Sequence, residues 1–221
     1  ILKIDGQATD GLAVDKAVKF IRGKEGTVVV LILSRESKKE PLTISITRAQ
    51  IEIPTIKTEK KEGSKDGLTD GVFIIHLYNF SAISSNLFRE ALREFVVTNS
   101  NKLILDLRGN PGGYLDAAAD MASWFLPSGK VIVTEDFGKN SEPIVYKSKG
   151  YNVFGEKLKM VVLINGGSAS ASEILAGALQ ENGVATLIGE KSFGKGSVQE
   201  LVKITPETSL KVTVARWLTP L

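Results

Sequence analysis

The residues that could do chemistry gather in the last third of the chain, in NGGSASASE at 165–173 and GEKSFGKGSVQ at 189–199. The first stretch follows an apolar run typical of a buried strand and precedes a helical pattern, which predicts a sharp strand-to-helix turn crowded with hydroxyls. Such a turn exposes a hydroxyl beside the free N–H groups of a helix start, and these groups can stabilise an oxyanion. The second stretch holds Lys195 among glycines. A turn hydroxyl and a lysine are the parts of a nucleophile and its base.

Ser170 has two interpretations. Ser170-Ala171-Ser172-Glu173 spells the capping box S-x-x-E, in which the serine side chain caps the helix and the glutamate reaches back to it. The same position suits a nucleophile, because it lies at the turn itself. The turn alone leaves both interpretations open.

A serine nucleophile needs a proton acceptor, and the chain offers His76 and Lys195. His76 lies between Ile75 and Leu77 in an apolar run, where a half-exposed sheet residue is expected. A lysine acts as a base only when it is neutral, and burial favours that form by lowering its pKa. Lys195 is flanked by Phe193 and by small residues that let the backbone approach closely, so a shielded amine is one interpretation. A solvated loop lysine is the other, and it is the more usual one for a lysine in a loop.

The run from Gly189 to Lys195 also approximates the phosphate-binding P-loop, G-x-x-x-x-G-K-[ST]. Gly196 stands where that motif needs a hydroxyl for Mg²⁺. A P-loop must also run directly into a helix, and Pro206 shortens any helix here. A nucleotide-binding enzyme therefore ranks below a serine nucleophile as an interpretation.

The elements that must position these residues alternate between strands and helices from 71 to 190, which predicts a layered α/β core. The helix over SSNLFREALREFVVTN is expected to bury Leu87, Ala91, Leu92 and Phe95 on one face. The other predicted helices are YLDAAADMASWFL and SASEILAGALQENG, and the predicted strands are GVFIIHLYNF, KLILDLRGN, KMVVLIN, VATLIG and SLKVTVARWLTP.

The first 36 residues read as a strand, a helix from about Val14 to Arg22 and the β-branched strand TVVVLIL. This segment is too short for a stable core of its own, so we expect it to belong to something larger. Strand-like alternation follows, and residues 59–70 are expected to form an exposed loop or hairpin.

Composition excludes several classes of site. The 221 residues carry a net charge of +3 from 28 basic and 25 acidic side chains, which is too balanced to argue for nucleic acid. There is no cysteine, so disulfides and thiol catalysis are excluded, and a single histidine cannot build a histidine-rich metal site. No apolar run approaches the roughly 18 residues of a membrane span.

The segment NGGSASASEILAGALQENGVATLIGEKSFGKGSVQ, in which Lys195 follows Ser170 at a distance of 25 positions, resembles the catalytic segment of the carboxyl-terminal processing proteases, also called tail-specific proteases. LILDLRGNPGGYLDAA resembles the same family's DLRxNPGG segment, and the first 35 residues resemble the second half of its PDZ domain. The resemblance implies a layered α/β, crotonase/ClpP-like protease core with a partial PDZ domain at the N-terminus.

The resemblance also implies roles for particular residues in a Ser-Lys dyad. Ser170 would be the nucleophile, Lys195 the general base, and Gln199 would orient the lysine amine. The oxyanion hole would use the main-chain N–H groups of Ala171 and of one glycine in the Gly112-Gly113 pair, of which Gly113 is preferred. Lys195 would then take a proton from Ser170 rather than hold a phosphate.

At the scale of the chain, the resemblance implies the C-terminal part of a PDZ domain at 1–36, linker or cap strands and a loop at 37–70, and a C-terminally incomplete serine protease core at 71–221. The implied activity is a serine endopeptidase that trims proteins from their C-terminal region, without metal or cofactor. Expected partners are unfolded or C-terminally exposed proteins and peptides, an adaptor protein and further copies in a homo-oligomer, with no nucleic acid. The expected location is extracytoplasmic, in a bacterial periplasm or at the outer face of a membrane. A catalytically silent peptide-binding scaffold of the same fold is the alternative.

Overall fold

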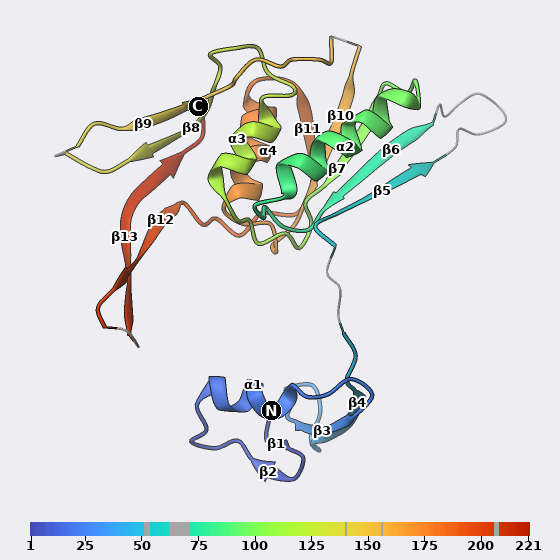
Figure 1. The fold of residues 1–221 in the computed structure, drawn as a ribbon, viewed down its shortest axis with the longest axis vertical. Coiled ribbons are helices and arrows are strands. Elements are labelled where there is room, and N and C mark those ends of the chain that lie inside the picture. The colour runs from blue at the N-terminus through green and yellow to red at the C-terminus, as the bar shows by residue number, and fades with distance from the viewer. Residues whose placement is uncertain (51–53, 62–70, 140, 156, 206–207) are drawn as a thin grey trace. The chain divides into compact units, whose positions relative to one another are not determined.

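The computed structural model describes residues 1–50, 54–61, 71–139, 141–155, 157–205 and 208–221 (Figure 1). The chain divides into two compact units, unit 1 at Ile1–Ile53 and unit 2 at Pro54–Leu221. This division differs from the predicted boundaries at residues 36 and 70, because the strands expected to link the two parts pair with one sheet or the other. Of the loop or hairpin expected at 59–70, residues 59–61 belong to a strand, β5 (Ile56–Lys61), that pairs antiparallel with β6 (Val72–Leu77), and residues 62–70 lie outside the described residues.

Unit 1 is a small sheet with strand order β2-β1-β3-β4 and one helix. Among its described residues, the buried apolar cluster is Ile4, Val29 and Leu31, against which Ala17 and Ile21 of the helix pack. The helix predicted from about Val14 to Arg22 and the strand predicted at TVVVLIL are thus both present. The elements are β1 (Lys3–Ile4), β2 (Gln7–Ala8), α1 (Val14–Ile21), β3 (Val28–Leu33) and β4 (Leu42–Thr47).

Unit 2 is built on a five-stranded sheet with strand order β11-β10-β7-β6-β5. All neighbours are parallel except β5, which runs antiparallel at one edge. Parallel strands are joined by crossover connections, and β6, β7 and β10 bury alternate residues. The strand β11, at the other edge from β5, has no buried residue. The strands are β5 (Ile56–Lys61), β6 (Val72–Leu77), β7 (Lys102–Asp106), β10 (Lys159–Ile164) and β11 (Ala185–Gly189).

Three helices supply most of the remaining core of unit 2, and α3 lies beside α4 in Figure 1. The predicted buried face of α2 needs one correction. Leu87 is 38% exposed, whereas Phe88 is fully buried, because Phe88, Ala91, Leu92 and Phe95 follow the i, i+3, i+4, i+7 spacing of one stripe. The helices are α2 (Ser84–Val97), α3 (Leu115–Ala122) and α4 (Ala171–Glu181).

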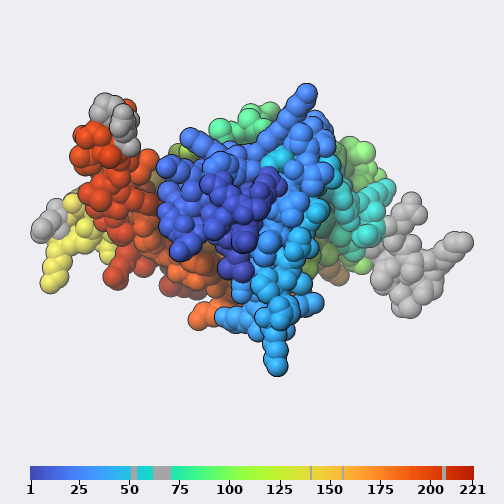
Figure 2. Space-filling model, turned by 90° about the horizontal axis from the view of Figure 1, so that it is seen from below, coloured from blue at the N-terminus to red at the C-terminus, as the bar shows by residue number. Residues whose placement is uncertain are grey.

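A second, four-stranded antiparallel sheet has the order β12-β13-β8-β9. Of these strands the sequence predicts only β13, because the segment of β12 is considered above only as a helix that Pro206 would shorten. The β12–β13 hairpin projects from the body of unit 2 (Figure 1, Figure 2) and exposes apolar side chains such as Leu201 and Leu210. The strands are β8 (Val131–Asp136), β9 (Ile144–Lys147), β12 (Ser197–Lys203) and β13 (Ser209–Leu218).

The parallel pairing of β7 with β10 brings two loops together. Both strands end at the same edge of the sheet, where sites in open α/β sheets form. The loops are held by hydrogen bonds from Leu107 N to Leu163 O at 2.9 Å and from Ala169 N to Asn110 O at 3.0 Å. The glycine pair after β7 therefore lies beside the serine turn after β10.

Candidate active site

Ser170 occupies the turn between β10 and α4 with strained main-chain geometry. Its φ of 56° and ψ of −116° lie outside the regions that non-glycine residues favour, and an ordinary N-cap residue has extended geometry instead. Such geometry costs about 1–3 kcal/mol and persists where the surrounding structure enforces it, as it does in the nucleophile elbow of hydrolases. The capping box of Ser170 and Glu173 is present as well, so Ser170 caps α4, while its strained backbone resembles that of a nucleophile.

The other two hydroxyls of the turn have structural roles. Ser168 is fully buried, and its Oγ donates to Leu107 O at 2.8 Å and accepts from Asn165 N at 3.0 Å. Ser172 is also fully buried and donates to Asn110 O at 2.9 Å. Ser170 is half-buried and is thus the hydroxyl of the three that a substrate can reach.

Two main-chain N–H groups beside Ser170 are available to an oxyanion. The N–H of Gly112 is already used, since it donates to Asn110 Oδ1 at 2.9 Å. Among the hydrogen bonds of the described residues, none uses the N–H of Gly113 or of Ala171, and as the first residue of α4 Ala171 has no acceptor within the helix. The structure thus brings together Ser170 and both predicted oxyanion donors.

Gly112 and Gly113 lie where the loop after β7 closely approaches neighbouring main-chain atoms. A Cβ on Gly112, whose φ is 96°, would lie 2.6 Å from Ala169 O and 2.9 Å from both Ala171 N and Ser170 Cβ. A Cβ on Gly113 would collide with the carbonyl oxygen of Phe80. Because only glycine has room at these two positions, the loop after β7 can pack directly against the serine turn.

Lys195 reaches the site through its main chain. It is half-buried in the segment between β11 and β12, and its N–H donates to Glu173 Oε2 at 3.0 Å. Within the described residues, no hydrogen bond or ion pair of the Lys195 amine is recorded, so the amine is not joined to Ser170 Oγ in this conformation. Gln199 is exposed in β12 beside a β-bulge and is not joined to the amine either.

The nucleotide-binding alternative is contradicted by the fold of the same segment. Lys195 is followed by strand β12, which pairs with β13, and not by a helix. The segment therefore lacks the helix N-terminus that a P-loop presents to phosphate.

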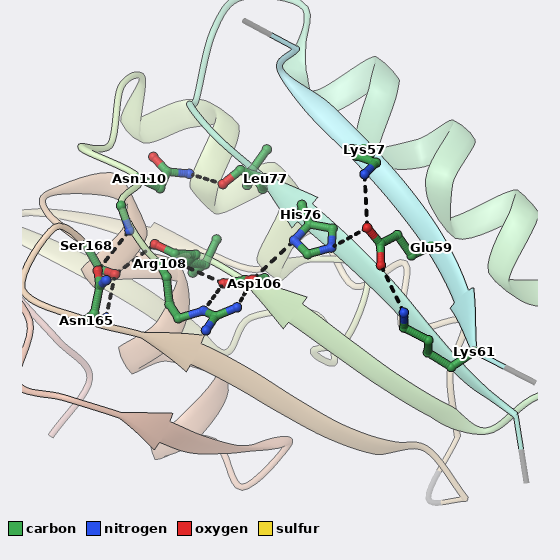
Figure 3. A network of polar contacts seen from close by, with 12 residues as sticks. Lys57, Glu59, Lys61, His76, Leu77, Asp106, Arg108, Asn110, Asn165 and Ser168 are labelled. Atoms are coloured by element: carbon green, nitrogen blue, oxygen red, sulfur yellow. Dashed lines mark hydrogen bonds and ion pairs between the residues drawn. The ribbon is translucent and has the colours of Figure 1, made fainter. Parts of the chain in front are cut away.

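His76 belongs to a polar network on the sheet, drawn in Figure 3, and its side chain is 20% exposed. Its Nδ1 lies 3.1 Å from Asp106 Oδ2, and its Nε2 lies 3.6 Å from Glu59 Oε1. Arg108 makes a bidentate contact with Asp106, at 2.9 Å and 2.7 Å. Burial raises the pKa of Asp106, but the hydrogen bonds and charge of Arg108 outweigh burial and hold that pKa below its usual value.

This network lies at the start of the loop that leads to Gly112 and Gly113, because Asp106 ends β7 and Arg108 begins the loop. The ion pair of Asp106 and Arg108 was not predicted from the sequence. It could have been predicted from an acidic and a basic residue two positions apart at the end of an apolar strand. Across the described part of the chain, no cluster of three or more potential metal ligands is found, and no helix is long and apolar enough to cross a membrane.

Comparisons with known proteins give a consistent result. Residues 71–221 match the family model of peptidase family S41. The chain is 36% identical over 219 residues to the carboxy-terminal processing protease CtpA of Bacillus subtilis (strain 168), an alignment that covers 99% of this chain and 45% of that protein. It is 35% identical over 220 residues to a probable CtpA-like serine protease of Staphylococcus aureus (strain COL), covering 100% of this chain and 42% of that protein.

Among solved structures, the photosystem II D1 C-terminal processing protease matches with a TM-score of 0.75 and 26% sequence identity. The match covers 100% of this chain and 58% of that chain. The chain spans less than half the length of the two curated relatives above. The layered α/β core that the sequence predicts is confirmed by this likeness, whereas the PDZ assignment of unit 1 stays a prediction.

Proposed function

Because this chain belongs to peptidase family S41, we propose that it carries the catalytic site of a serine endopeptidase that cleaves or trims proteins in their C-terminal region. The observation that carries the proposal is the geometry of Ser170. Its hydroxyl lies on a strained turn, beside the unused N–H groups of Gly113 and Ala171. A nucleophile and a site for the oxyanion are thus present at the same place.

The reaction proceeds through an acyl-enzyme. The Lys195 amine, in its neutral form, takes the proton of Ser170 Oγ as the oxygen attacks the scissile carbonyl carbon. The carbonyl oxygen becomes an oxyanion that accepts hydrogen bonds from Gly113 and Ala171. The lysine returns the proton to the leaving amine as the C–N bond breaks, and water then hydrolyses the ester. Gln199 orients the lysine amine once the Lys195 side chain has rotated toward Ser170.

A catalytically silent peptide-binding scaffold is the second candidate, and one observation favours it. Within the part of the chain that the structure describes, the Lys195 amine makes no hydrogen bond to Ser170 Oγ. Proton transfer needs heavy atoms within about 3 Å, although catalytic hydrogen bonds are often longer in the absence of substrate. An active peptidase must therefore reach a second conformation, whereas a silent scaffold need not.

The wider setting is part of the proposal. Unit 1 selects apolar C-terminal tails in the manner of a PDZ domain, and the substrates are unfolded proteins or peptides with exposed C-termini. An adaptor protein delivers substrates, the active form is a homo-oligomer, and the protein works outside the cytoplasm, in a bacterial periplasm or at the outer face of a membrane. The family resemblance supports these statements, and co-purification, light scattering and cell fractionation test them.

Covalent labelling by a fluorophosphonate probe tests the catalytic proposal. The wild-type protein should form one adduct, located on Ser170 by peptide mass spectrometry. Ser170→Ala should remove the adduct, and Ser141→Ala, at an exposed serine distant in sequence, should retain it. Absence of labelling in the folded wild-type protein, together with binding of C-terminal peptides, would establish the silent scaffold instead.

A further inference from the structure

Glu173, the third residue of α4, makes more contacts than a helix cap requires. Its carboxylate accepts four hydrogen bonds and so uses the full acceptor capacity of an ionised side chain. Oε2 accepts from Ser170 N at 2.8 Å and from Lys195 N at 3.0 Å, and Oε1 accepts from Ser192 Oγ at 2.8 Å and from Gly194 N at 2.7 Å.

Only one of these four bonds belongs to the capping box that the sequence predicts. The bond to Ser170 N satisfies the start of α4. The other three come from the segment that carries Lys195, residues 190–196, which we call the lysine loop. Among the described residues, one further hydrogen bond joins that loop to the serine turn, from Phe193 N to Ser168 O at 3.0 Å.

The bond pattern links the proposed nucleophile directly to the proposed base. The main-chain nitrogens of Ser170 and Lys195 donate to the same oxygen atom of Glu173. The position of the Lys195 main chain relative to Ser170 is therefore set by one side chain. The lysine amine can move by rotating its own side chain, but its point of attachment is fixed.

The chemistry of the contact calls for a carboxylate. Three main-chain N–H groups and one hydroxyl converge on it, and an ionised carboxylate accepts such bonds more strongly than a neutral group does. It also lies in the first turn of α4, where negative charge is favoured. A glutamine of the same shape offers one acceptor oxygen and turns an NH₂ group toward the remaining donors.

We infer that Glu173 is a positioning residue, which holds the lysine loop against the serine turn so that the Lys195 amine can reach Ser170 Oγ. The inference rests on the proposed function, because it assigns Glu173 a role through Lys195. It goes beyond helix capping, because capping requires the bond to Ser170 N alone.

Fluorophosphonate labelling rates of Glu173→Gln, Lys195→Ala and the double variant test the inference. We expect Glu173→Gln to label about 100-fold more slowly than wild type, because misplacement of a reacting group by about 1 Å costs that much. In the Lys195→Ala background the same substitution should change the remaining rate less than twofold, since the group it positions is absent. With a fluorogenic peptide, kcat should fall while KM changes less than threefold.

Two further variants separate positioning from stability. Glu181→Gln makes the same substitution at another glutamate of α4, whose carboxylate accepts one hydrogen bond, from Leu221 N. This control variant should label at the wild-type rate. Glu173→Asp keeps the charge at the helix start but is too short to hold both Ser170 N and the lysine loop, so it should label as slowly as Glu173→Gln. If Glu173→Gln does not fold, as judged by circular dichroism, Glu173→Asp carries the comparison.

The outcomes distinguish this inference from the proposed function. Equal labelling of wild type and Ser170→Ala would refute the proposed function itself. Specific labelling of Ser170 with a wild-type rate in folded Glu173→Gln or Glu173→Asp would overturn only the role of Glu173. A slowing by the same factor with and without Lys195 would also overturn it, because Glu173 would then act on Ser170 and not through the lysine.

Discussion

At the scale of single residues, the three serines of the turn are equivalent in the sequence and different in the structure. Ser168 and Ser172 are buried and donate to main-chain carbonyls of the neighbouring loop, whereas Ser170 has a strained backbone and an accessible hydroxyl. The sequence identifies the turn, because a buried strand, two glycines and a helical pattern are local features. It could not rank the serines by residue type, since their carbonyl partners lie about 60 residues away in the chain.

Proton transfer by Lys195 can be separated from a role of its charge. Lys195→Arg keeps a positive charge but cannot lose its proton near neutral pH. We expect peptide cleavage to fall by about 10²–10⁴-fold, the range for loss of a general base, and to match the loss in Lys195→Ala. Lys191→Arg, at an exposed position of the same segment, is the control and should cleave at the wild-type rate. Activity in the Arg variant with none in the Ala variant would show that charge alone is needed.

The Asp106–Arg108 pair predicts a dependence of stability on pH. Because the folded-state pKa of Asp106 is held below its usual value, the charged form contributes stability that is present above about pH 4 and is lost as the pH falls through the folded-state pKa. Asp106→Asn should lower the free energy of unfolding at pH 7 by about 1–3 kcal/mol. The difference from wild type should narrow as the pH is lowered below 4.

Urea unfolding at pH 7 and at pH 3 measures this difference. Asp136→Asn, at the exposed end of β8, is the matched control and should differ from wild type by less than about 0.5 kcal/mol at pH 7. If Asp106→Asn lowers the free energy of unfolding by the same amount at both pH values, the ionisation of Asp106 does not contribute to stability.

At the scale of elements, the sequence predicts the strands of the parallel sheet and misses most strands of the antiparallel sheet. Strands β6, β7, β10 and β11 are continuous apolar runs between helices, so their type follows from local pattern. Strands β8, β9 and β12 belong to antiparallel hairpins with exposed residues, and their existence depends on pairing partners. The error at Leu87 has a similar origin, because apolar residues at the margin of a helical stripe are buried only if a neighbour covers them.

The loop after β7 offers a matched pair of glycines. Gly112 and Gly109 both have positive φ, but a Cβ on Gly112 would lie 2.6 Å from Ala169 O, whereas a Cβ on Gly109 would meet no atom within 4 Å. Alanine should cost about 1–2 kcal/mol of backbone strain at either position. Gly112→Ala should in addition displace the loop from Ala171 and lower activity by about 10²–10³-fold, as loss of an oxyanion donor does.

Gly109→Ala should keep its activity within about fivefold of wild type. Cleavage rates and thermal unfolding of the two variants, compared side by side, separate strain from displacement of the loop. Equal losses of activity would mean that the loop does not need to contact the serine turn closely.

At the scale of the whole molecule, the division of the chain was the least predictable feature. The sequence analysis ends its first segment at residue 36, where the charged stretch after β3 begins. In the structure β4 pairs with β3 over six residue pairs and so belongs to unit 1, while β5 pairs with β6 in unit 2. Alternation identifies a strand but not its partner, because strand pairing is a long-range choice.

The proposed role of unit 1 in selecting tails can be tested on α1. Val14 and Val18 are one helical turn apart on the same face and are 76% and 36% exposed, so this helix presents an apolar surface that its own core does not use. Substituting both by serine removes that surface and leaves Ala17 and Ile21 in the small core. Because burial of a valine contributes about 1.5 kcal/mol or more, the preference for an apolar over a charged C-terminal residue should fall about tenfold.

The measurement is the ratio of kcat/KM for two peptides that differ only in the C-terminal residue. Fluorophosphonate labelling of Ser170 should be unchanged in the Val14→Ser, Val18→Ser variant, because the substitutions lie in unit 1 and leave the serine turn intact. Lys16→Ser, on the opposite face of α1, is the control and should keep the wild-type ratio. An unchanged ratio in the valine variant, with both peptides still cleaved, would mean that this face of α1 does not read the tail, and tail selection would then have to be sought in unit 2.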